Sequence, residues 1–277
     1  MWTKLRFYTE VLSLDICAGV LGSAALAKTM LASTMEPCWW LLLPASVWVI
    51  YTADHLFDAR KTGSTAVNRR HKFHSDNFRL LTLCAIATGT ACVAAAFWCL
   101  REIVFLAGAF MGTLALAHLA LAYWGRIRIG KEFSVAIVYA CGVWFAPYLN
   151  RTVEVSAAIA VAFGLFLLAA LLNLFMNSLI ELSVDRSEQQ VFALRTLAPS
   201  LVRRAVIGVA VVSFIVLLVL ASGLTGFAYR WEFTYLTFLC TVPGGILFFE
   251  DYFLVNARYR LPAELAFLAG IGLLLPH

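Results

Sequence analysis

Nine long apolar segments constrain the fold of this chain more than any other feature of its sequence. A helix needs about 20 predominantly apolar residues to cross the hydrocarbon layer of a membrane. Because these segments are continuous and rich in Ala and Leu, rather than alternating, they predict helices and not strands. We expect an all-α, polytopic membrane bundle of about nine transmembrane helices, in a single domain over residues 1–277. The predicted spans are Val11–Leu31, Cys38–Phe57, Leu80–Leu100, Ile103–Trp124, Phe133–Leu149, Val155–Ile180, Ala205–Leu224, Phe233–Phe249 and Leu261–Leu275.

The composition also indicates a chain embedded in the lipid bilayer. Of its residues, 62% are hydrophobic and only 13% are charged, about half the charged share of a typical soluble domain. The seven cysteines lie mostly inside the apolar segments and form no Cys-x-x-Cys pair, so we expect them to pack as small apolar residues. The net charge of +5 comes from the loops and does not indicate nucleic-acid binding.

The distribution of Lys and Arg predicts the orientation, because cytoplasmic loops of membrane proteins are enriched in both. With the N-terminus inside, the cytoplasmic side holds all but four of the 21 basic residues, the exceptions being Lys28, Arg101, Arg151 and Arg230. We therefore expect a cytoplasmic N-terminus and an outer C-terminus, in a membrane such as the bacterial inner membrane. The long loops, about residues 59–78 and 181–204, then lie on the cytoplasmic face and are expected to hold the site.

Two acidic pairs occur at corresponding places in the sequence. Asp54 and Asp58 end the second apolar segment, and Glu181 and Asp185 follow the sixth with the same spacing. Residues four apart share one face of a helix. The offset of 127 residues (181 − 54) contains four predicted spans, so both pairs are expected at the same depth on the cytoplasmic face. The repeat predicts two related four-helix units.

Carboxylate oxygens in this arrangement suit a hard divalent cation, and Mg²⁺ commonly uses one or two carboxylates together with waters and phosphates. Acids, metal and bases at the mouth of an apolar bundle fit an amphiphile with a diphosphate head and a hydrocarbon tail. Alternatively, the acids pair with neighbouring bases and only anchor the helix ends. The bases on this face, which suit phosphate oxygens, are Arg60, Lys61, Arg69, Arg70, Lys72, Arg126, Arg128, Lys131, Arg186 and Arg195.

Polar residues inside the predicted spans are candidates for the interior of the bundle. Asn173, Asn177, Glu181 and Asp185 follow one another at four-residue spacing and form a stripe on one helix face. Such a stripe lines a cavity or makes hydrogen bonds between helices, and we expect Asn177 to belong to the site. Asp15, about one turn into the first span, either pairs with a loop Arg or contacts a substrate.

Aromatic and histidine side chains also have more than one interpretation. Tyr139 and its aromatic neighbours in the fifth span line a hydrocarbon tunnel, where they shield a carbocation, or they pack between helices. His71 and His74 lie in the basic loop, and we expect them to be solvated or lipid-facing rather than catalytic.

On these residues the chain resembles the UbiA superfamily of intramembrane prenyltransferases, over nearly its whole length. That family is a nine-helix bundle with Asp-rich motifs, broadly NxxxDxxxD and DxxxD, at the ends of helices two and six. Asp54 and Asp58 match the first motif, in which Ile50 replaces the Asn, and Glu181 and Asp185 match the second, with Glu for the first Asp. Further similarities are Thr196 with Leu197, Tyr123 with Arg126 and Arg128, and the N-terminal Arg6.

The resemblance implies Mg²⁺-dependent transfer of an isoprenoid chain from a prenyl diphosphate donor to a lipophilic or aromatic acceptor inside the membrane. It implies that Asp54, Asp58, Glu181 and Asp185 hold the metal and act in catalysis. Two other functions stay open: a membrane terpene cyclase of the same family, and a non-catalytic or transport-like protein that binds ions or lipid headgroups through the same acids. Candidates for diphosphate binding are Arg60, Arg70, Arg128, Lys131, Arg186 and Arg195.

Overall fold

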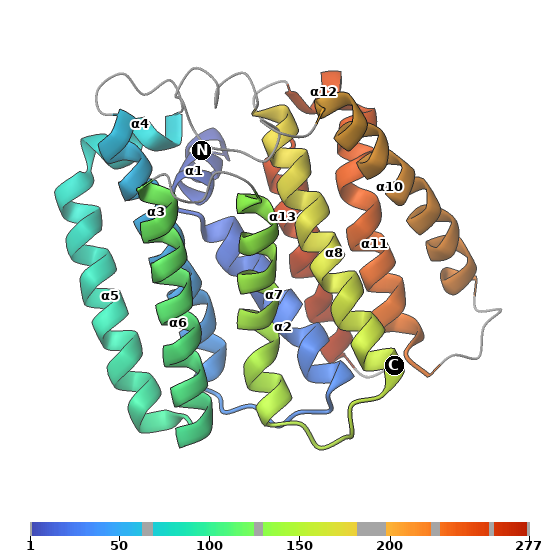
Figure 1. Cartoon of the computed structure of the whole chain (residues 1–277), viewed down its shortest axis with the longest axis horizontal. Helices are drawn as coiled ribbons and strands as arrows, with labels where there is room; N and C mark the ends of the chain where they lie inside the picture. Colours follow the sequence, from blue (N-terminus) through green and yellow to red (C-terminus); the bar gives the residue numbers. More distant parts are fainter. Residues whose placement is uncertain are drawn as a thin grey trace.

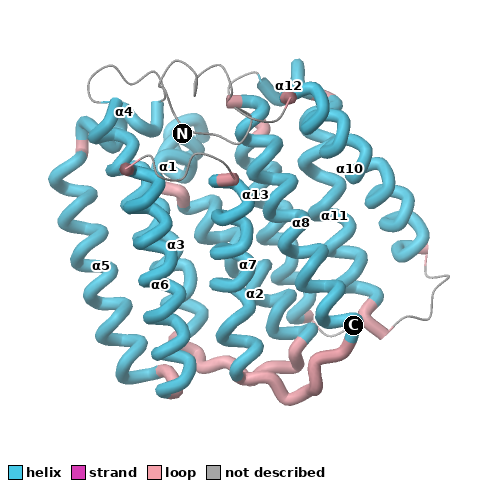
Figure 2. Tube along the Cα trace, viewed as in Figure 1, coloured by secondary structure: helices cyan, strands magenta, loops and turns pink. Residues whose placement is uncertain are grey.

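The computed structural model describes residues 2–62, 69–124, 130–181, 198–222, 228–254 and 258–275, and in these ranges the chain forms helices joined by turns and loops, without strands (Figure 2). The helices are α1 (Trp2–Val11), α2 (Leu14–Met30), α3 (Trp39–Thr62), α4 (Arg69–Asp76), α5 (Phe78–Cys99), α6 (Glu102–Tyr123), α7 (Lys131–Leu149), α8 (Ala157–Ile180), α10 (Pro199–Ala221), α11 (Arg230–Phe248), α12 (Glu250–Leu254), α13 (Arg260–Leu268) and the 3₁₀ helix η4 (Ala269–Leu274).

Each predicted span coincides with a helix, which confirms the prediction of an all-α membrane bundle. Among the described residues, six helices are both long enough and apolar enough to cross a membrane: Trp39–Arg60 within α3, Phe78–Cys99, Glu102–Tyr123, Lys131–Leu149, Ala157–Ile180 and Pro199–Ala221. The other three predicted spans correspond to α2, with 17 residues, to α11, and to α13 continued by η4. A total of nine spans and a two-unit repeat stay predictions.

The first long loop is shorter in the structure than in the prediction. Helix α3 continues to Thr62, and Arg69–Asp76 forms α4. Helix α4 has a buried side and an exposed side: His74 is only 1% exposed, whereas Lys72 and Asp76 are exposed. The expectation that His74 is solvated or lipid-facing is therefore wrong, because the α4 backbone turns this ring toward α3, where it lies 5.0 Å from the His55 ring.

The bundle has a central helix and two lipid-facing edges. Helix α5 lies at one edge and α10 at the other, while α2 lies between them (Figure 1). Ten of the 17 residues of α2 are buried, against two in α5 and three in α10. The edge helices are apolar on all sides, as expected where lipid tails replace protein contacts. The N-terminus, α4 and α12 lie at one end of the bundle, and the C-terminus lies towards the other (Figure 1).

Glycine permits a very close contact between α2 and the α13–η4 segment. A Cβ atom at Gly22 would lie 2.0 Å from the carbonyl oxygen of Phe267, and one at Gly270 would lie 2.4 Å from the carbonyl oxygen of Gly22. Small residues let helix backbones approach in membranes, where packing drives association. The short C-terminal helix is thereby held against the centre of the bundle.

The substitution Gly22→Ala tests this contact. The added methyl group has no space beside the Phe267 backbone, so the two helices must separate, at a cost of about 1–3 kcal/mol. We expect the melting temperature in detergent, followed by tryptophan fluorescence, to fall by several degrees. Gly112→Ala in α6 is the control, because no atom lies within 4 Å of its added Cβ. Equal melting temperatures for the two variants would contradict the contact.

Candidate functional site

The polar residues of the interior gather at the end of the bundle that holds the N-terminus and α4. Helices α3 and α8, which carry the two acidic motifs, both finish at this end (Figure 1). Helix α13 starts there, at Arg260, and α7 starts there, at Lys131. Side chains from these helices form the candidate site.

The acidic pair of α3 is half-buried. Asp54 makes no side-chain hydrogen bond or ion pair with the rest of the described chain, whereas Asp58 does interact with neighbours. Asp54 and Lys131 are both close enough to His118 of α6 for their charges to act on that ring. The Asp54 carboxylate and the Lys131 ammonium group therefore both lie near the part of α6 that carries His118.

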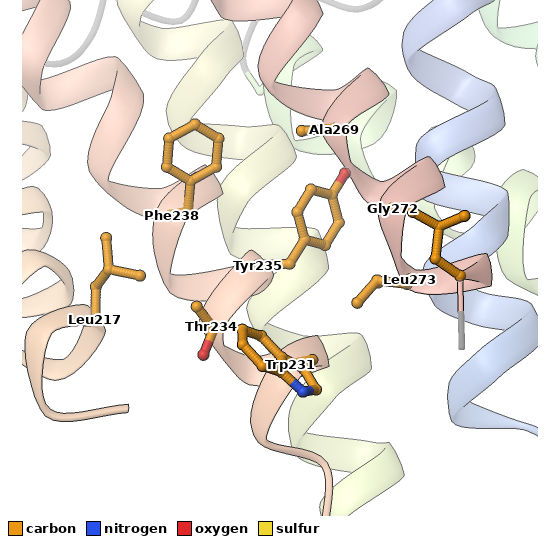
Figure 3. Close-up of a pocket in the computed structure, with 9 residues that line it drawn as sticks. Leu217, Trp231, Thr234, Tyr235, Phe238, Ala269, Gly272 and Leu273 are labelled. Carbon is orange, nitrogen blue, oxygen red and sulfur yellow. The ribbon is translucent and has the colours of Figure 1, made fainter. Parts of the chain in front are cut away.

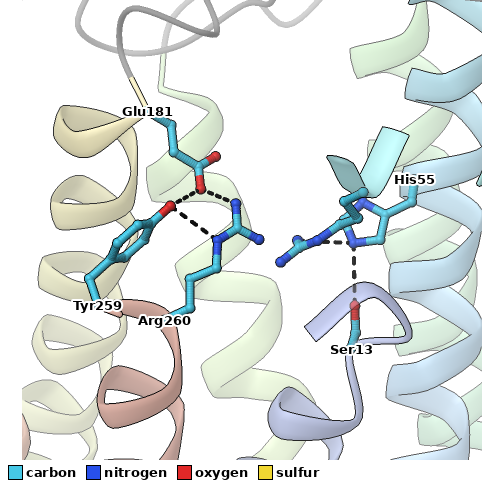
Figure 4. A network of polar contacts seen from close by, with 6 residues as sticks. Ser13, His55, Glu181, Tyr259 and Arg260 are labelled. Carbon is cyan, nitrogen blue, oxygen red and sulfur yellow. Dashed lines mark hydrogen bonds and ion pairs between the residues drawn. The ribbon is translucent and has the colours of Figure 1, made fainter. Parts of the chain in front are cut away.

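Glu181 is held by the start of α13. Its Oε1 atom accepts a hydrogen bond of 2.5 Å from the Tyr259 hydroxyl and forms an ion pair with Arg260. The Arg260 Nε atom also donates to the Tyr259 oxygen, at 3.0 Å. These three side chains form a closed network at the C-terminal end of α8 (Figure 4).

A second network joins the α1–α2 junction to α3 and α4. The Ser13 hydroxyl lies 3.3 Å from His55 Nε2, and Arg70 Nη1 lies 3.2 Å from the same atom. The Nδ1 atom of His74 forms a hydrogen bond of 2.9 Å with the Arg70 carbonyl oxygen. Figure 4 shows Ser13 and His55 across from the Glu181 network. Arg70 was predicted to lie in a loop, but it lies on α4 and its side chain contacts His55 of α3.

Between these networks lies a deeper pair of carboxylates, Asp15 on α2 and Glu264 on α13. Asp15 is 4% exposed, and the charges of Asp15 and Arg70 both act on Glu264. The Asn173 amide of α8 donates to Glu264 Oε1 at 3.3 Å, while its buried Oδ1 atom has no hydrogen-bond partner. Glu264 Oε2 lies 3.9 Å from the position of a Cβ at Gly19, one turn along from Asp15. We call Asp15, Glu264 and Asn173 the deep cluster.

An aromatic group lies next to the deep cluster, further into the bundle. The Tyr139 hydroxyl is 3.0 Å from Ser23 Oγ, and its ring stacks on Phe166 with centroids 5.8 Å apart. Phe267, three residues after Glu264, packs edge-on to Tyr139 and to Phe166. The Tyr139 ring packs between helices beside buried polar groups. This position fits both interpretations of Tyr139, as the lining of a hydrocarbon tunnel and as a packing residue.

The remaining predicted residues fall in different places. Arg60 is exposed, Lys131 is half-buried in the first turn of α7, and Asn177 is half-buried between Asn173 and Glu181. Of the polar stripe on α8, both Asn173 and Glu181 bond to residues at or near α13. The interhelical interpretation of the stripe therefore holds for these two residues. Outside the described residues lie Asp185, Arg128, Arg186 and Arg195.

The two acids of α3 are the described residues to compare with the needs of a bound metal ion. No group of three His, Cys, Asp or Glu side chains among them is placed to hold a metal ion. Mg²⁺ needs only one or two protein carboxylates when phosphates and waters complete its octahedron. Asp54 and Asp58, half-buried and one helical turn apart, fit that requirement, while Glu181 is already engaged by Arg260 and Tyr259.

A separate apolar groove lies near the opposite end of the bundle, between α10, α11 and η4 (Figure 3). It has a volume of about 420 Å³, and the only hydroxyl groups on its walls are those of Thr234 and Tyr235. This lining offers little for binding a charged group, so the polar end is the better candidate site. The groove is lined by Leu217, Trp231, Thr234, Tyr235, Phe238, Ala269, Gly272, Leu273 and Leu275.

Comparison with known proteins does not assign the chain to a family: no family model matches it, and neither a curated protein nor a solved structure is significantly similar to it.

Tyr259 and Glu264 were not predicted from the sequence as residues of the site. Tyr259, Arg260 and Glu264 belong to no motif with recognisable spacing. A signal was nevertheless present, because Glu264 is a lone acid inside a predicted span, and ionisable residues within spans usually face the interior and have a partner.

The Glu181–Arg260 pair gives a second testable prediction. The Arg260 and Glu181 side chains are 15% and 23% exposed, so Arg260→Leu leaves a poorly solvated carboxylate, at a cost of about 2–3 kcal/mol. The matched control is Arg203→Leu, because Arg203 pairs with Glu250 but is 42% exposed, and exposed pairs contribute about 1 kcal/mol or less. We expect the melting temperature to fall further for Arg260→Leu, and the reverse order would contradict the buried network.

Proposed function

We propose that this protein is a UbiA-like prenyltransferase that uses Mg²⁺ and the α3 acids to bind an isoprenoid diphosphate at the polar end of the bundle. The observation that carries the proposal is that α3 and α8 finish at the same end of the bundle. At this end, acidic and basic side chains lie next to an apolar, aromatic interior. This arrangement suits an amphiphile with a charged head and a hydrocarbon tail. The nine-span topology, the two-unit repeat and the cytoplasmic placement of this end form part of the proposal.

Asp54 and Asp58 are the proposed metal-binding residues of the described chain, with Asp185 as a further ligand from the sequence motif. Bound Mg²⁺ would stabilise the negative charge that develops on the departing diphosphate. Lys131 at the start of α7 and the exposed Arg60 near the end of α3 would bind phosphate oxygens. Arg70 is a weaker candidate, because it bonds to His55 and faces the deep cluster.

The apolar interior is the proposed place of the isoprenoid chain. Tyr139, Phe166 and Phe267 pack around one point beneath the deep cluster. Aromatic faces attract a positive charge, and a dry interior protects a carbocation from water. These side chains would therefore orient the hydrocarbon tail and shield its reacting end.

The deep cluster is the proposed site for the polar head of the acceptor. Two of its acceptor oxygens, Glu264 Oε2 and the buried Asn173 Oδ1, accept no hydrogen bond from the part of the chain that the structure describes. They complement a hydroxyl or amine that donates hydrogen bonds. As the acceptor atom bonds to the allylic carbon and the carbon–oxygen bond to diphosphate breaks, the proton of the acceptor would pass to Glu264.

The acids of α3 provide the main test of the proposal. Binding of a non-hydrolysable prenyl thiolodiphosphate to protein in nanodiscs is measured with Mg²⁺ and with EDTA. We expect wild type to bind only with Mg²⁺, and Asp54→Asn and Asp58→Asn each to lose at least tenfold in affinity, about 1.4 kcal/mol. Asp76→Asn is the control, because Asp76 is an exposed acid at the same end, on α4.

Two results would count against this function. If wild type bound the analogue equally with and without Mg²⁺, the metal assignment would be lost. If wild type bound no prenyl diphosphate of any chain length, the non-catalytic alternative would gain support. In that case the Glu181–Arg260–Tyr259 network would serve only to join α8 to α13.

Glu264→Gln separates binding of the donor from transfer to the acceptor. We expect affinity for the thiolodiphosphate to stay within twofold of wild type, because Glu264 of α13 is not one of the proposed metal-binding or phosphate-binding residues. Transfer of a labelled prenyl group to lipids of a membrane extract should fall by about 10²–10⁴-fold, the usual contribution of a general base. The control is Glu232→Gln, in the first turn of α11. Unchanged transfer in Glu264→Gln would remove Glu264 from the mechanism.

A further inference from the structure

Two cysteines meet at the end of the bundle opposite the candidate site. Cys38 directly precedes α3, and Cys99 is the last residue of α5. The Cys38 thiol donates a hydrogen bond of 3.3 Å to the carbonyl oxygen of Cys99, 61 residues further along the chain, and it also contacts the Cys99 thiol. The pair was not expected from the sequence, where the cysteines have no disulfide-like spacing.

Polar contacts hold both cysteines in place. Arg101 Nη1, two residues after Cys99, donates to Asn150 Oδ1 at 2.8 Å. The amide of Asn150 in turn donates to Glu36 Oε2 at 3.3 Å, two residues before Cys38. Asn150 is 5% exposed, so this bridge between three loops is sheltered. The two chain segments that carry the thiols are therefore fixed to one common residue.

The redox environment of the pair follows from the orientation. The distribution of Lys and Arg predicts that this end of the bundle faces away from the cytoplasm. Disulfides form and persist in extracytoplasmic compartments, where thiols are not kept reduced. Two adjacent thiols on rigid segments in such a compartment are well placed for oxidation.

We propose that Cys38 and Cys99 form a disulfide bond in the mature protein, which joins the outer end of α3 to the outer end of α5. The oxidant is a disulfide, of a small molecule or a protein, and the reaction is thiol–disulfide exchange. One thiolate attacks the oxidant and displaces one of its sulfurs as a thiolate. The second cysteine then loses its proton, attacks the mixed disulfide and releases the other sulfur, so that the oxidant leaves as two thiols.

The exposed cysteine is the one expected to attack first. Partial burial and the neighbouring Cys99 thiol raise the pKa of the Cys38 thiol to about 11, which keeps it protonated. Cys99 is exposed and open to a soluble or membrane-bound oxidant. Cys38 then resolves the mixed disulfide from its position beside Cys99.

The test is differential alkylation of the full-length protein in membranes of the expressing cells. Free thiols are blocked with N-ethylmaleimide at harvest and during denaturation, disulfides are then reduced, and the released thiols receive a heavy-isotope maleimide. We expect Cys38 and Cys99 to carry mainly the heavy label. Cys92, two turns earlier in α5, is the internal control and should carry the light label. In Cys38→Ser protein, Cys99 should change to the light label.

Two further results decide the proposal. Reduction with dithiothreitol should lower the melting temperature of wild type by several degrees, because the bridge closes a long loop in the unfolded chain. The same treatment should leave Cys38→Ser unchanged. Light label on both Cys38 and Cys99 in wild type would overturn the proposal, whatever the outcome for prenyl diphosphate binding.

Discussion

Carboxylates inside an apolar bundle require compensation, and this constraint determines how the helices meet at the polar end. A buried charge without a partner is costly because the protein interior solvates it poorly. Glu181, at the end of α8, forms an ion pair with Arg260, and Glu264 of α13 accepts a hydrogen bond from Asn173. Arg70 supplies positive charge near Glu264. Each of these contacts joins elements that are distant in sequence. The acids thus fix which helices are neighbours, in addition to any chemical role.

The contact between α2 and α13 makes this arrangement possible. Gly22 and Gly270 let the backbones approach so closely that side chains at these positions would collide with the opposite helix. Gly19, one turn earlier, leaves open the position beside which Glu264 Oε2 lies. Small residues on α2 therefore hold the short C-terminal helix close to the centre of the bundle. A Cβ at Gly19 would lie 3.1 Å from both the Glu264 carbonyl oxygen and the Phe267 Cβ, so a larger residue there would disturb the packing of α2 on α13 before it reached the carboxylate.

The positions of the helices were predictable from the sequence, whereas the partners of the polar residues were not. Hydropathy is a local property, so each apolar segment could be identified by itself, as for Phe78–Cys99 in α5. The stripe of Asn173, Asn177 and Glu181 was also visible on one helix face, but its partner depends on which helix packs there. Glu264 stands alone in an apolar segment, and a single residue has no spacing from which to predict a contact. Helix α4 was taken as loop because its basic composition gives no long apolar face, yet burial of His74 alone gives it an inner side.

Helix α3 connects the two ends of the molecule on which the proposals depend. Its N-terminal end begins directly after Cys38, and its C-terminal part carries Asp54 and Asp58. A helix of 24 residues is about 36 Å long at 1.5 Å per residue, and its hydrogen-bonded backbone resists stretching and compression along the helix axis. Fixing the N-terminal end of α3 through the Asn150 bridge therefore also fixes the position of the acidic pair relative to α6 and α7. The loops at the end of the bundle opposite the candidate site in this way help to set its geometry.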